Sequence, residues 1–249
     1  MLGTIFLSEI VGTALLILLG AGVCCAVSFN GSKAKDSGWL VITFGWAFAV
    51  FSGVIVSLRS GGHLNPAVTL GLAVSKIGSP NPEFVAGVPV DAASIGTYIA
   101  AQFIGAFIGA ALAWLAYKKQ FDIDQPEGSK LGVYSTGPAI RSYGWNVVTE
   151  VIATFVLVFV VIGFGKWEGG TLGPLGALAV AFLILVLGVS LGGPTGYALN
   201  PARDLGPRIW HAVAPIPNKG DSDWAYSWVP VVGPILGGVI AGVTAGILL

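Results

Sequence analysis

The sequence is poor in charge. Only 10% of its 249 residues are Asp, Glu, Lys or Arg, against about 25% in an average soluble domain. Acidic and basic residues balance at 12 each, and no basic run offers the positive surface that nucleic acid binding needs. Hydrophobic residues make up 55% of the chain and the mean hydropathy is +0.84. A soluble protein this apolar could not cover its own surface, so a lipid bilayer is the expected solvent.

Residues for disulfide or metal chemistry are also scarce. The chain has two adjacent cysteines, Cys24 and Cys25, and two histidines, His63 and His211. Neighbours on a helix point in different directions, so we expect buried thiols rather than a disulfide. The cysteines and histidines lack the spacing of a metal site, and no apolar segment pairs a nucleophile with a base. We therefore expect no cofactor, and an intramembrane enzyme is the least favoured function.

Long apolar runs dominate the remainder. A membrane-spanning helix needs about 20 mostly apolar residues, and six segments qualify: 5–29, 38–58, 95–117, 145–165, 174–191 and 228–249. The first has no charged n-region and is long enough to span, so we predict no cleavable signal peptide. Charges gather between the segments, at 33–36, 118–141, 166–168 and 219–223. Small residues four apart, such as Gly105 and Gly109 or Gly233 and Gly237, predict close helix packing.

The chain repeats two short patterns. Glu9 lies in the first segment within Glu-Ile-Val-Gly-Thr, and Glu150 lies in the fourth within Glu-Val-Ile-Ala-Thr, an offset of 150 − 9 = 141 residues. Asn65-Pro66-Ala67 follows the second segment and Asn200-Pro201-Ala202 follows the fifth, an offset of 200 − 65 = 135 residues. These offsets predict two homologous halves of three spans each.

The halves fall at about 1–120 and 140–249 of a single domain, 1–249, and an extramembrane loop at about 118–144 links them. Because three spans is an odd number, the second half must enter the membrane from the opposite side. The predicted fold is therefore an all-α membrane protein with an inverted 3+3 repeat.

Each Asn-Pro-Ala motif begins a segment that is too short to span. Asn is a favoured N-cap and Pro a favoured first helical residue, which predicts short helices at 66–76 and 201–211. The first would reach about 16 Å, roughly half of the hydrocarbon core. Gly-rich stretches at 60–64 and 192–196 precede them, where we expect extended backbone with carbonyls facing a lumen.

Half-helices that enter from opposite faces can meet at the midplane with their N-termini converging. Each N-terminus carries about half a positive charge, which repels cations and protons. The side chains of Asn65 and Asn200 can donate N–H groups to a passing oxygen. This predicts a pore that water or an alcohol can enter and hydronium cannot. A single Asn-Pro-Ala would indicate only a turn, but two copies in matching positions disfavour that interpretation.

The motifs resemble those of the major intrinsic proteins, the aquaporin and aquaglyceroporin family. The resemblance covers nearly the whole chain, including 60–69, 196–208, Gln102 and Gly233-Pro234. It implies six transmembrane helices plus two re-entrant half-helices, cytoplasmic termini and a homotetramer with one pore per subunit in the cell membrane. It also implies a passive channel for glycerol, other small neutral solutes and water.

A selectivity filter near the extracellular mouth is implied as well. Three of its positions match Gly188, Tyr197 and Arg203. The fourth falls on Trp46 if one gap is allowed and on Gly45 without it, and Phe44 lies close by. Trp46 is preferred, because the set Trp-Gly-Tyr-Arg resembles that of glycerol-conducting members. Arg203 is expected to bind hydroxyls and repel cations, Gly188 to leave room for a carbon chain, and the two aromatic rings to face its CH groups.

The resemblance assigns supporting roles to further residues. The implied pore-lining carbonyls are those of Gly61, Gly62, His63, Leu64, Tyr197, Ala198 and Leu199. Glu9 and Glu150 would accept hydrogen bonds from the re-entrant loops, with a proton relay as the alternative. Asp204 marks glycerol-conducting relatives and either shapes the loop beside the filter or is a solvated carboxylate at a helix start. A pair between Asp204 and Arg203 is disfavoured, because successive helical residues point apart.

Several alternatives remain open. A water-selective channel of the same fold and a proton-coupled transporter using Glu9 and Glu150 both fit the pattern. The implied orientation also conflicts with the excess of Lys and Arg expected in cytoplasmic loops. It places more of these residues outside (Lys33, Lys35, Lys118, Lys119, Lys130 and Arg141) than inside (Arg59, Lys76 and Lys166). Pro207 is expected to kink the second half-helix.

Overall fold

Six long helices carry the predicted apolar segments in the computed structural model, which describes residues 1–166 and 175–249. They are α1 (Leu2–Ser28), α2 (Trp39–Val56), α4 (Ala92–Ala116), α7 (Tyr143–Gly165), α8 (Leu175–Leu191) and α10 (Val229–Leu248). Five are long and apolar enough to cross a bilayer, and α8 is apolar with 17 described residues. Glu168, in a predicted charged loop, and Pro174, the predicted start of the fifth span, lie outside the described residues.

Two short helices begin at the Pro of each Asn-Pro motif, as predicted: α3 (Pro66–Ser75) and α9 (Pro201–Val213). The remaining elements are small: η1 (Leu58–Ser60), β1 (Glu83–Val85), β2 (Val88–Pro89), α5 (Lys118–Asp122) and α6 (Ser129–Gly132). The strands β1 and β2 form an antiparallel hairpin, with Glu83 opposite Pro89 and Val85 opposite Val88. This hairpin was not predicted from the sequence. The α9 helix continues through Pro207 to Val213.

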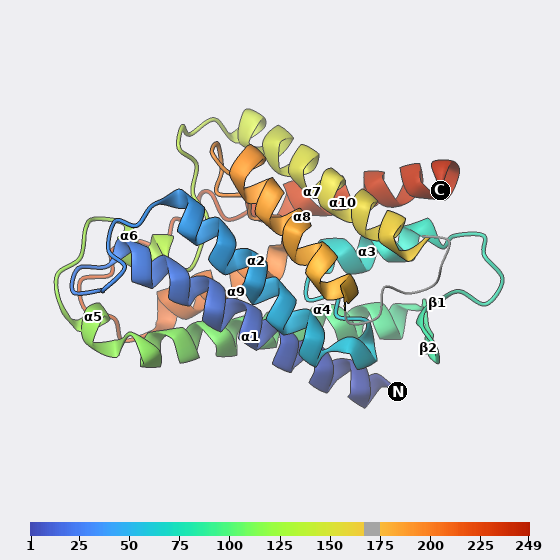
Figure 1. The fold of residues 1–249 in the computed structure, drawn as a ribbon, viewed down its shortest axis with the longest axis horizontal. Coiled ribbons are helices and arrows are strands. Elements are labelled where there is room, and N and C mark those ends of the chain that lie inside the picture. The colour runs from blue at the N-terminus through green and yellow to red at the C-terminus, as the bar shows by residue number, and fades with distance from the viewer. Residues whose placement is uncertain (167–174) are drawn as a thin grey trace.

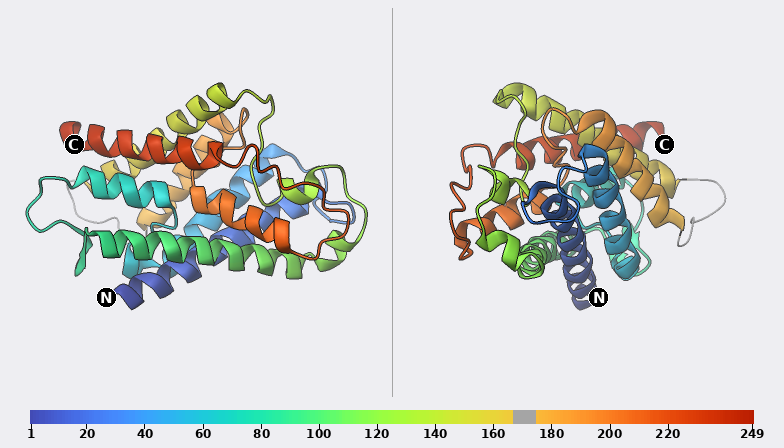
Figure 2. Two further views of the ribbon diagram at one scale, coloured as in Figure 1. Left: turned by 180° about the vertical axis from the view of Figure 1, so that it is seen from behind. Right: turned by 60° about the vertical axis from the view of Figure 1, so that its left-hand side comes forward.

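The helices pack as two interlocked halves (Figures 1 and 2). The first helix of each half packs on the third, α1 on α4 and α7 on α10, and α2 meets α8 across the molecule. Each half-helix packs on the third helix of the other half, α3 on α10 and α9 on α4. This exchange brings both half-helices into the middle of the bundle. Both chain termini lie at the same end of the molecule.

Glycines allow the closest helix crossings, as the spacing of small residues predicts. A Cβ on Gly105 would lie 2.6 Å from the carbonyl oxygen of Ile10, where α4 crosses α1. A Cβ on Gly237 would lie 2.4 Å from the carbonyl oxygen of Val151, at the equivalent crossing of α10 and α7. At these distances any side chain would force the backbones apart.

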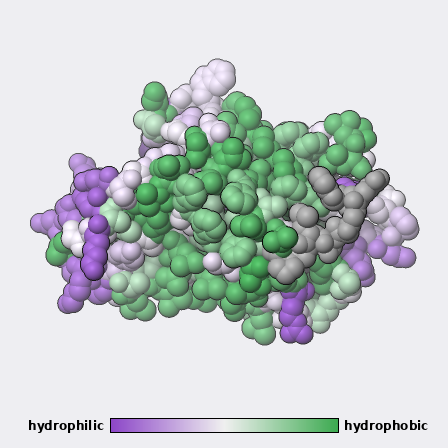
Figure 3. Space-filling view, in the orientation of Figure 1, coloured by the Kyte–Doolittle hydropathy of each residue, from purple (hydrophilic) through white to green (hydrophobic). Residues whose placement is uncertain are grey.

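A wide apolar band surrounds the bundle. Figure 3 shows hydrophobic residues across the middle of one face and hydrophilic residues gathered at its two ends. Large apolar side chains on the outside include Leu7, Phe44, Phe182 and Ile240. An apolar surface this extensive is unfavourable in water and suits the hydrocarbon of a bilayer. The molecule therefore crosses the membrane along its long axis.

Candidate pore site

The Asn residues of both motifs cap their half-helices. Asn65 and Asn200 have extended backbone, with φ of −156° and −149°, and Pro follows each at the start of the helix. Asn65 Oδ1 accepts from Ala67 N at 2.8 Å, and Asn200 Oδ1 accepts from Ala202 N at 3.0 Å. The capping predicted from the residue types is therefore present at both sites.

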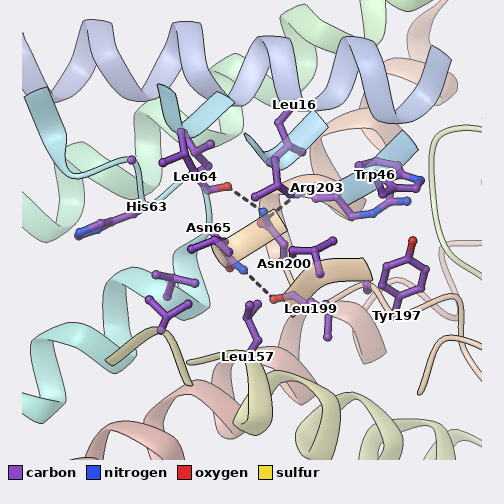
Figure 4. A pocket seen from close by; sticks show the side chains of 18 of the residues that line it. Leu16, Trp46, His63, Leu64, Asn65, Leu157, Tyr197, Leu199, Asn200 and Arg203 are labelled. Carbon is purple, nitrogen blue, oxygen red and sulfur yellow. Dashed lines mark hydrogen bonds between the residues drawn. The ribbon is translucent and has the colours of Figure 1, made fainter. Parts of the chain in front are cut away.

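The two caps are also bonded to each other's loops (Figure 4). Asn65 Nδ2 donates to the carbonyl of Leu199 at 2.8 Å, and Asn200 Nδ2 donates to the carbonyl of Leu64 at 2.7 Å. The N-termini of α3 and α9 thus meet end to end. One N–H of each amide is used in this cross-bond, so each Asn can offer only its second N–H to a solute. Donation from both Asn side chains to a passing oxygen was predicted from the sequence, but this cross-bond was not.

The loops before the half-helices turn more sharply than expected. Leu64, Tyr197 and Leu199 have φ of +54°, +41° and +57°, and Gly61, Gly62 and Gly196 are also left-handed. The expectation of extended backbone is therefore wrong in part, because left-handed residues interrupt both stretches. Left-handed backbone costs about 1–2 kcal/mol for a residue other than glycine. Strong local contacts must hold these residues in place.

Glu9 provides those contacts for the first loop. Its Oε1 accepts from Ser60 Oγ at 2.6 Å and from His63 N at 3.1 Å. Its Oε2 accepts from Leu64 N at 2.7 Å and from Gln102 Nε2 at 2.8 Å. The carboxylate is fully buried in the protein, and four donors compensate for its burial.

Glu150 does the same for the second loop. Its Oε1 accepts from Thr195 Oγ1 at 2.7 Å and from Ala198 N at 2.9 Å, and its Oε2 accepts from Leu199 N at 3.0 Å. Ser60 and Thr195 each precede their Asn by five residues (65 − 60 and 200 − 195). A hydroxyl residue at this repeated offset is a signal that the sequence analysis missed.

A cavity of about 140 Å³ runs beside the paired caps. All seven residues whose carbonyls were predicted to face a pore lie on its lining, together with Asn65, Asn200, Trp46 and Arg203. The other lining residues are apolar: Leu16, Val50, Val54, Val68, Leu72, Leu157, Val161, Val180 and Ile184. The lining thus combines the residues of both loops, the two Asn caps and Arg203 with a set of apolar side chains.

Arg203 lies at one end of this cavity against Trp46 (Figure 4). Its guanidinium carbon is 3.8 Å from the centroid of the Trp46 ring. Its Nη1 donates to the carbonyl of Tyr134 at 2.7 Å. This carbonyl comes from the loop between α6 and α7, and no motif in the sequence indicated it. The remaining N–H groups and the adjoining indole form a surface that is half polar and half apolar.

The other candidates for the fourth filter position point elsewhere. Phe44 is 42% exposed on the outside of the bundle. The backbone of Gly45 is packed against Val23, which a Cβ on Gly45 would approach to 2.6 Å. Of the three, only Trp46 lies on the cavity lining.

Gly188 was expected to leave room for the carbon chain of a solute, and the structure differs from this expectation. A Cβ at this position would lie 2.8 Å from Tyr197 Cζ and 3.0 Å from Tyr197 Oη. The space that its missing side chain leaves is therefore filled by the Tyr197 phenol rather than left open for a solute. Trp39 packs edge-to-face on Tyr197, with ring centroids 5.8 Å apart, and its Nε1 donates to the carbonyl of Gly188 at 3.0 Å.

Asp204 is buried. The alternative of a solvated carboxylate at a helix start is therefore wrong. Asp204 Oδ1 pairs with Arg208, with Nε and Nη2 both at 2.9 Å. Its Oδ2 accepts from Thr136 N at 2.7 Å and Thr136 Oγ1 at 2.8 Å. Arg208 Nη2 also donates to the carbonyl of Thr136 at 3.0 Å. The pair ties α9 to the same loop whose Tyr134 carbonyl holds Arg203.

The histidines and cysteines have structural contacts. The His63 ring stacks on Tyr98 with centroids 4.2 Å apart, and His211 Nδ1 lies 2.9 Å from Ser222 Oγ. Cys24 and Cys25 are free and buried. Within residues 1–166 and 175–249, no cluster of His, Cys, Asp and Glu side chains could hold a metal ion.

One exposed ion pair fastens the loops at the end away from the chain termini. Arg141 Nη2 lies 2.6 Å from Asp223 Oδ2, and Arg141 Nη1 lies 3.0 Å from Asp223 Oδ1. These hydrogen bonds from the guanidinium lower the pKa of Asp223. The pair joins the loop before α7 to the loop before α10, outside the membrane-spanning segments.

Comparison with known proteins identifies this architecture. The family model described as major intrinsic protein matches residues 3–244. The chain belongs to the major intrinsic protein family.

The relatives described next have names that refer to glycerol uptake or to an aquaglyceroporin. The chain is 50% identical to glycerol uptake facilitator protein 3 of Lactiplantibacillus plantarum, over 91% of this chain and 89% of the relative. It is 48% identical to a probable glycerol uptake facilitator protein of Thermotoga maritima, over 92% of this chain and 93% of the relative. Its structure is similar to the X-ray structure of the aquaglyceroporin from Plasmodium falciparum, with a TM-score of 0.81, 29% identity and coverage of 100% and 97%. The chain is thus an integral membrane protein of aquaporin fold, as predicted.

Proposed function

We propose that this chain is a passive channel for glycerol, other small neutral solutes and water, and that it excludes ions and protons. The observation that carries the proposal is the cavity beside the paired caps, whose lining is partly polar and partly apolar. A polyol presents both hydroxyls and CH groups, and the lining offers Asn65, Asn200 and Arg203 to the hydroxyls and apolar side chains to the CH groups. The names of the relatives described above support the same substrate.

Exclusion of cations follows from the charges at the cavity. The N-termini of α3 and α9 converge there, each with about half a positive charge, and Arg203 adds a full charge at one end. Glu9 and Glu150 are not among the residues that line the cavity, and their oxygens are bonded to the loop donors behind it. This bonding also argues against a proton relay, since a relay carboxylate must release its partners to take up a proton.

Reconstituted vesicles test the proposal. Under an inward glycerol gradient, vesicles with the protein should shrink and then re-swell faster than protein-free vesicles. Val68 lines the cavity, so Val68→Trp should abolish both water and glycerol flux. Val11 is 49% exposed on the outside of α1, and Val11→Trp is the matched control that should leave flux unchanged. Glycerol flux equal to that of empty vesicles would overturn the proposal.

A water-selective channel is the second candidate, and one observation favours it. The Tyr197 phenol fills the space above Gly188, which narrows the mouth. This candidate predicts rapid osmotic shrinkage without re-swelling in the same experiment.

We also propose a homotetramer with one pore per subunit. The apolar side chains exposed around the bundle provide area for subunit contacts as well as for lipid. Native mass spectrometry of the detergent-solubilised protein should give a species of four chains, and a monomer as the sole species would refute this part.

A further inference from the structure

One face of α1 contacts the cavity and its filter. Leu16, Gly20 and Cys24 are four residues apart, so they lie on the same side of the helix. Leu16 lines the cavity. Gly20 and Cys24 are buried, and both contact Trp46.

Gly20 lies against the benzene ring of the Trp46 indole. A Cβ on Gly20 would be 2.2 Å from Trp46 Cζ3 and 2.4 Å from both Cε3 and Cη2. A point that close to three consecutive ring atoms lies over the face of the ring, because an approach in the ring plane would leave the outer two atoms markedly farther away. The indole therefore stacks on the bare backbone of Gly20, with no space for even a methyl group.

Two further contacts fix the indole. Its Nε1 donates to Cys24 Sγ at 3.4 Å, which sets the rotation of the ring. The Arg203 guanidinium lies over the ring, with its carbon 3.8 Å from the centroid. Figure 4 shows Trp46 between α1 and Arg203 at one end of the cavity. Any displacement away from Gly20 is therefore directed toward Arg203 and the lumen.

We propose that Gly20 and Cys24 determine solute selectivity as positioning residues, by holding Trp46 back against α1 so that the pore mouth stays wide enough for a polyol. The inference rests on the proposed function, because it takes Trp46 as a wall of the filter. A Gly20 methyl would need to retreat from 2.2 Å to ordinary contact at 3.4 Å, a shift of 3.4 − 2.2 = 1.2 Å. The ring must supply most of that shift, since α1 is packed on α2 and α4.

The test compares Gly20→Ala with Gly22→Ala in proteoliposomes. Gly22 lies on the same helix, but a Cβ there would meet only Tyr117, at an ordinary 3.9 Å. A mouth narrowed by a displaced indole hinders a polyol more than water, because water is the smaller molecule. We expect glycerol permeability to fall about tenfold relative to water permeability in Gly20→Ala. We expect Gly22→Ala to match the wild type. Equal glycerol-to-water ratios in both variants would overturn the inference.

A second substitution distinguishes a clash between Gly20 and the Trp46 ring from a general packing defect. Phe is shorter than Trp and lacks the part of the ring that contacts Gly20, so Gly20→Ala combined with Trp46→Phe should regain the ratio of Trp46→Phe alone. A double variant that stays as impaired as Gly20→Ala would also refute the inference. If the wild type itself passes no glycerol, the proposed function fails first, and water permeability in the two glycine variants still tests whether the mouth narrows.

Cys24 gives an independent test that does not overpack α1. Cys24→Ser keeps an acceptor for the indole N–H, whereas Cys24→Ala removes it. We expect the glycerol-to-water ratio to change in Cys24→Ala and to be largely restored in Cys24→Ser. Identical ratios in the wild type and both variants would show that Cys24 does not position the ring.

Discussion

Arg208→Met should destabilise the protein strongly, because it leaves a buried carboxylate without its cation. The side chains of Arg208 and Asp204 are both 0% exposed. Removing one partner of a buried pair costs about 3–5 kcal/mol. For a chain of this length, 1 kcal/mol shifts the melting temperature by about 2–4 °C, so the expected loss is roughly 6–20 °C. Thermal unfolding in detergent, followed by intrinsic tryptophan fluorescence, measures it.

The chain offers a matched control for this experiment. Lys118 and Asp122 form another ion pair with i,i+4 spacing, but their side chains are 39% and 31% exposed. Such pairs contribute about 0–1 kcal/mol, so Lys118→Met should lower the melting temperature by a few degrees at most. Combining Arg208→Met with Asp204→Asn removes both charges and should recover part of the loss. If Arg208→Met and Lys118→Met melt at the same temperature, burial does not increase the cost of removing one partner of the ion pair, and the reasoning is refuted.

Three further predictions concern the cavity and its outer loops. Arg203→Ala should raise proton leak in vesicles loaded with a pH-sensitive dye, because it removes the full positive charge at the mouth, and an unchanged leak would count against the filter assignment. Glu150→Gln should reduce water and glycerol flux together without creating dependence on a proton gradient, since a Gln side chain cannot accept from all the loop donors; uptake that follows a proton gradient and is lost in this variant would instead support a coupled transporter. The lowered pKa of Asp223 beside Arg141 means that this contact stabilises the fold above the unfolded carboxyl pKa of about 3.9 and is lost as the pH falls through the lower folded value. Between pH 8 and pH 5 the contribution of this pair to the melting temperature should therefore stay constant. In stronger acid the melting temperature should decline, and Asp223→Asn should remove part of that decline. An identical acid decline in this variant would refute the assignment.

Local patterns made most of the fold predictable from the sequence. Spans depend on the length and hydropathy of one segment, and caps depend on the preference of Asn and Pro for helix starts. The closest contacts of Gly105 and Gly237 occur at the predicted spacing of small residues. The six long helices and two half-helices therefore follow from residues that are close together in the chain.

The details of the filter depend on irregular segments and could not be predicted this way. Tyr134 holds Arg203 through its backbone carbonyl, and every residue type has such a carbonyl. The Arg208–Asp204–Thr136 contact joins a half-helix to a loop 68 residues away, with no periodicity to indicate it. The role of Gly188 was mistaken, because its free space is filled by the side chain of Tyr197, whose backbone is left-handed.

The two halves make equivalent hydrogen bonds where they meet, but they differ at the residue that follows each Asn-Pro-Ala motif. Glu9 and Glu150 bond equivalent loop positions, and the Asn caps exchange equivalent bonds. This symmetry places the constriction at the paired caps in the middle of the bundle. By itself it would give the pore the same chemistry on both sides of the constriction. The residue after Asn-Pro-Ala breaks this symmetry, being Val68 in one half and Arg203 in the other, and both line the cavity. A charged, hydrogen-bonding filter can therefore exist at only one end, and the loop that carries Tyr134 and Thr136 is needed only there.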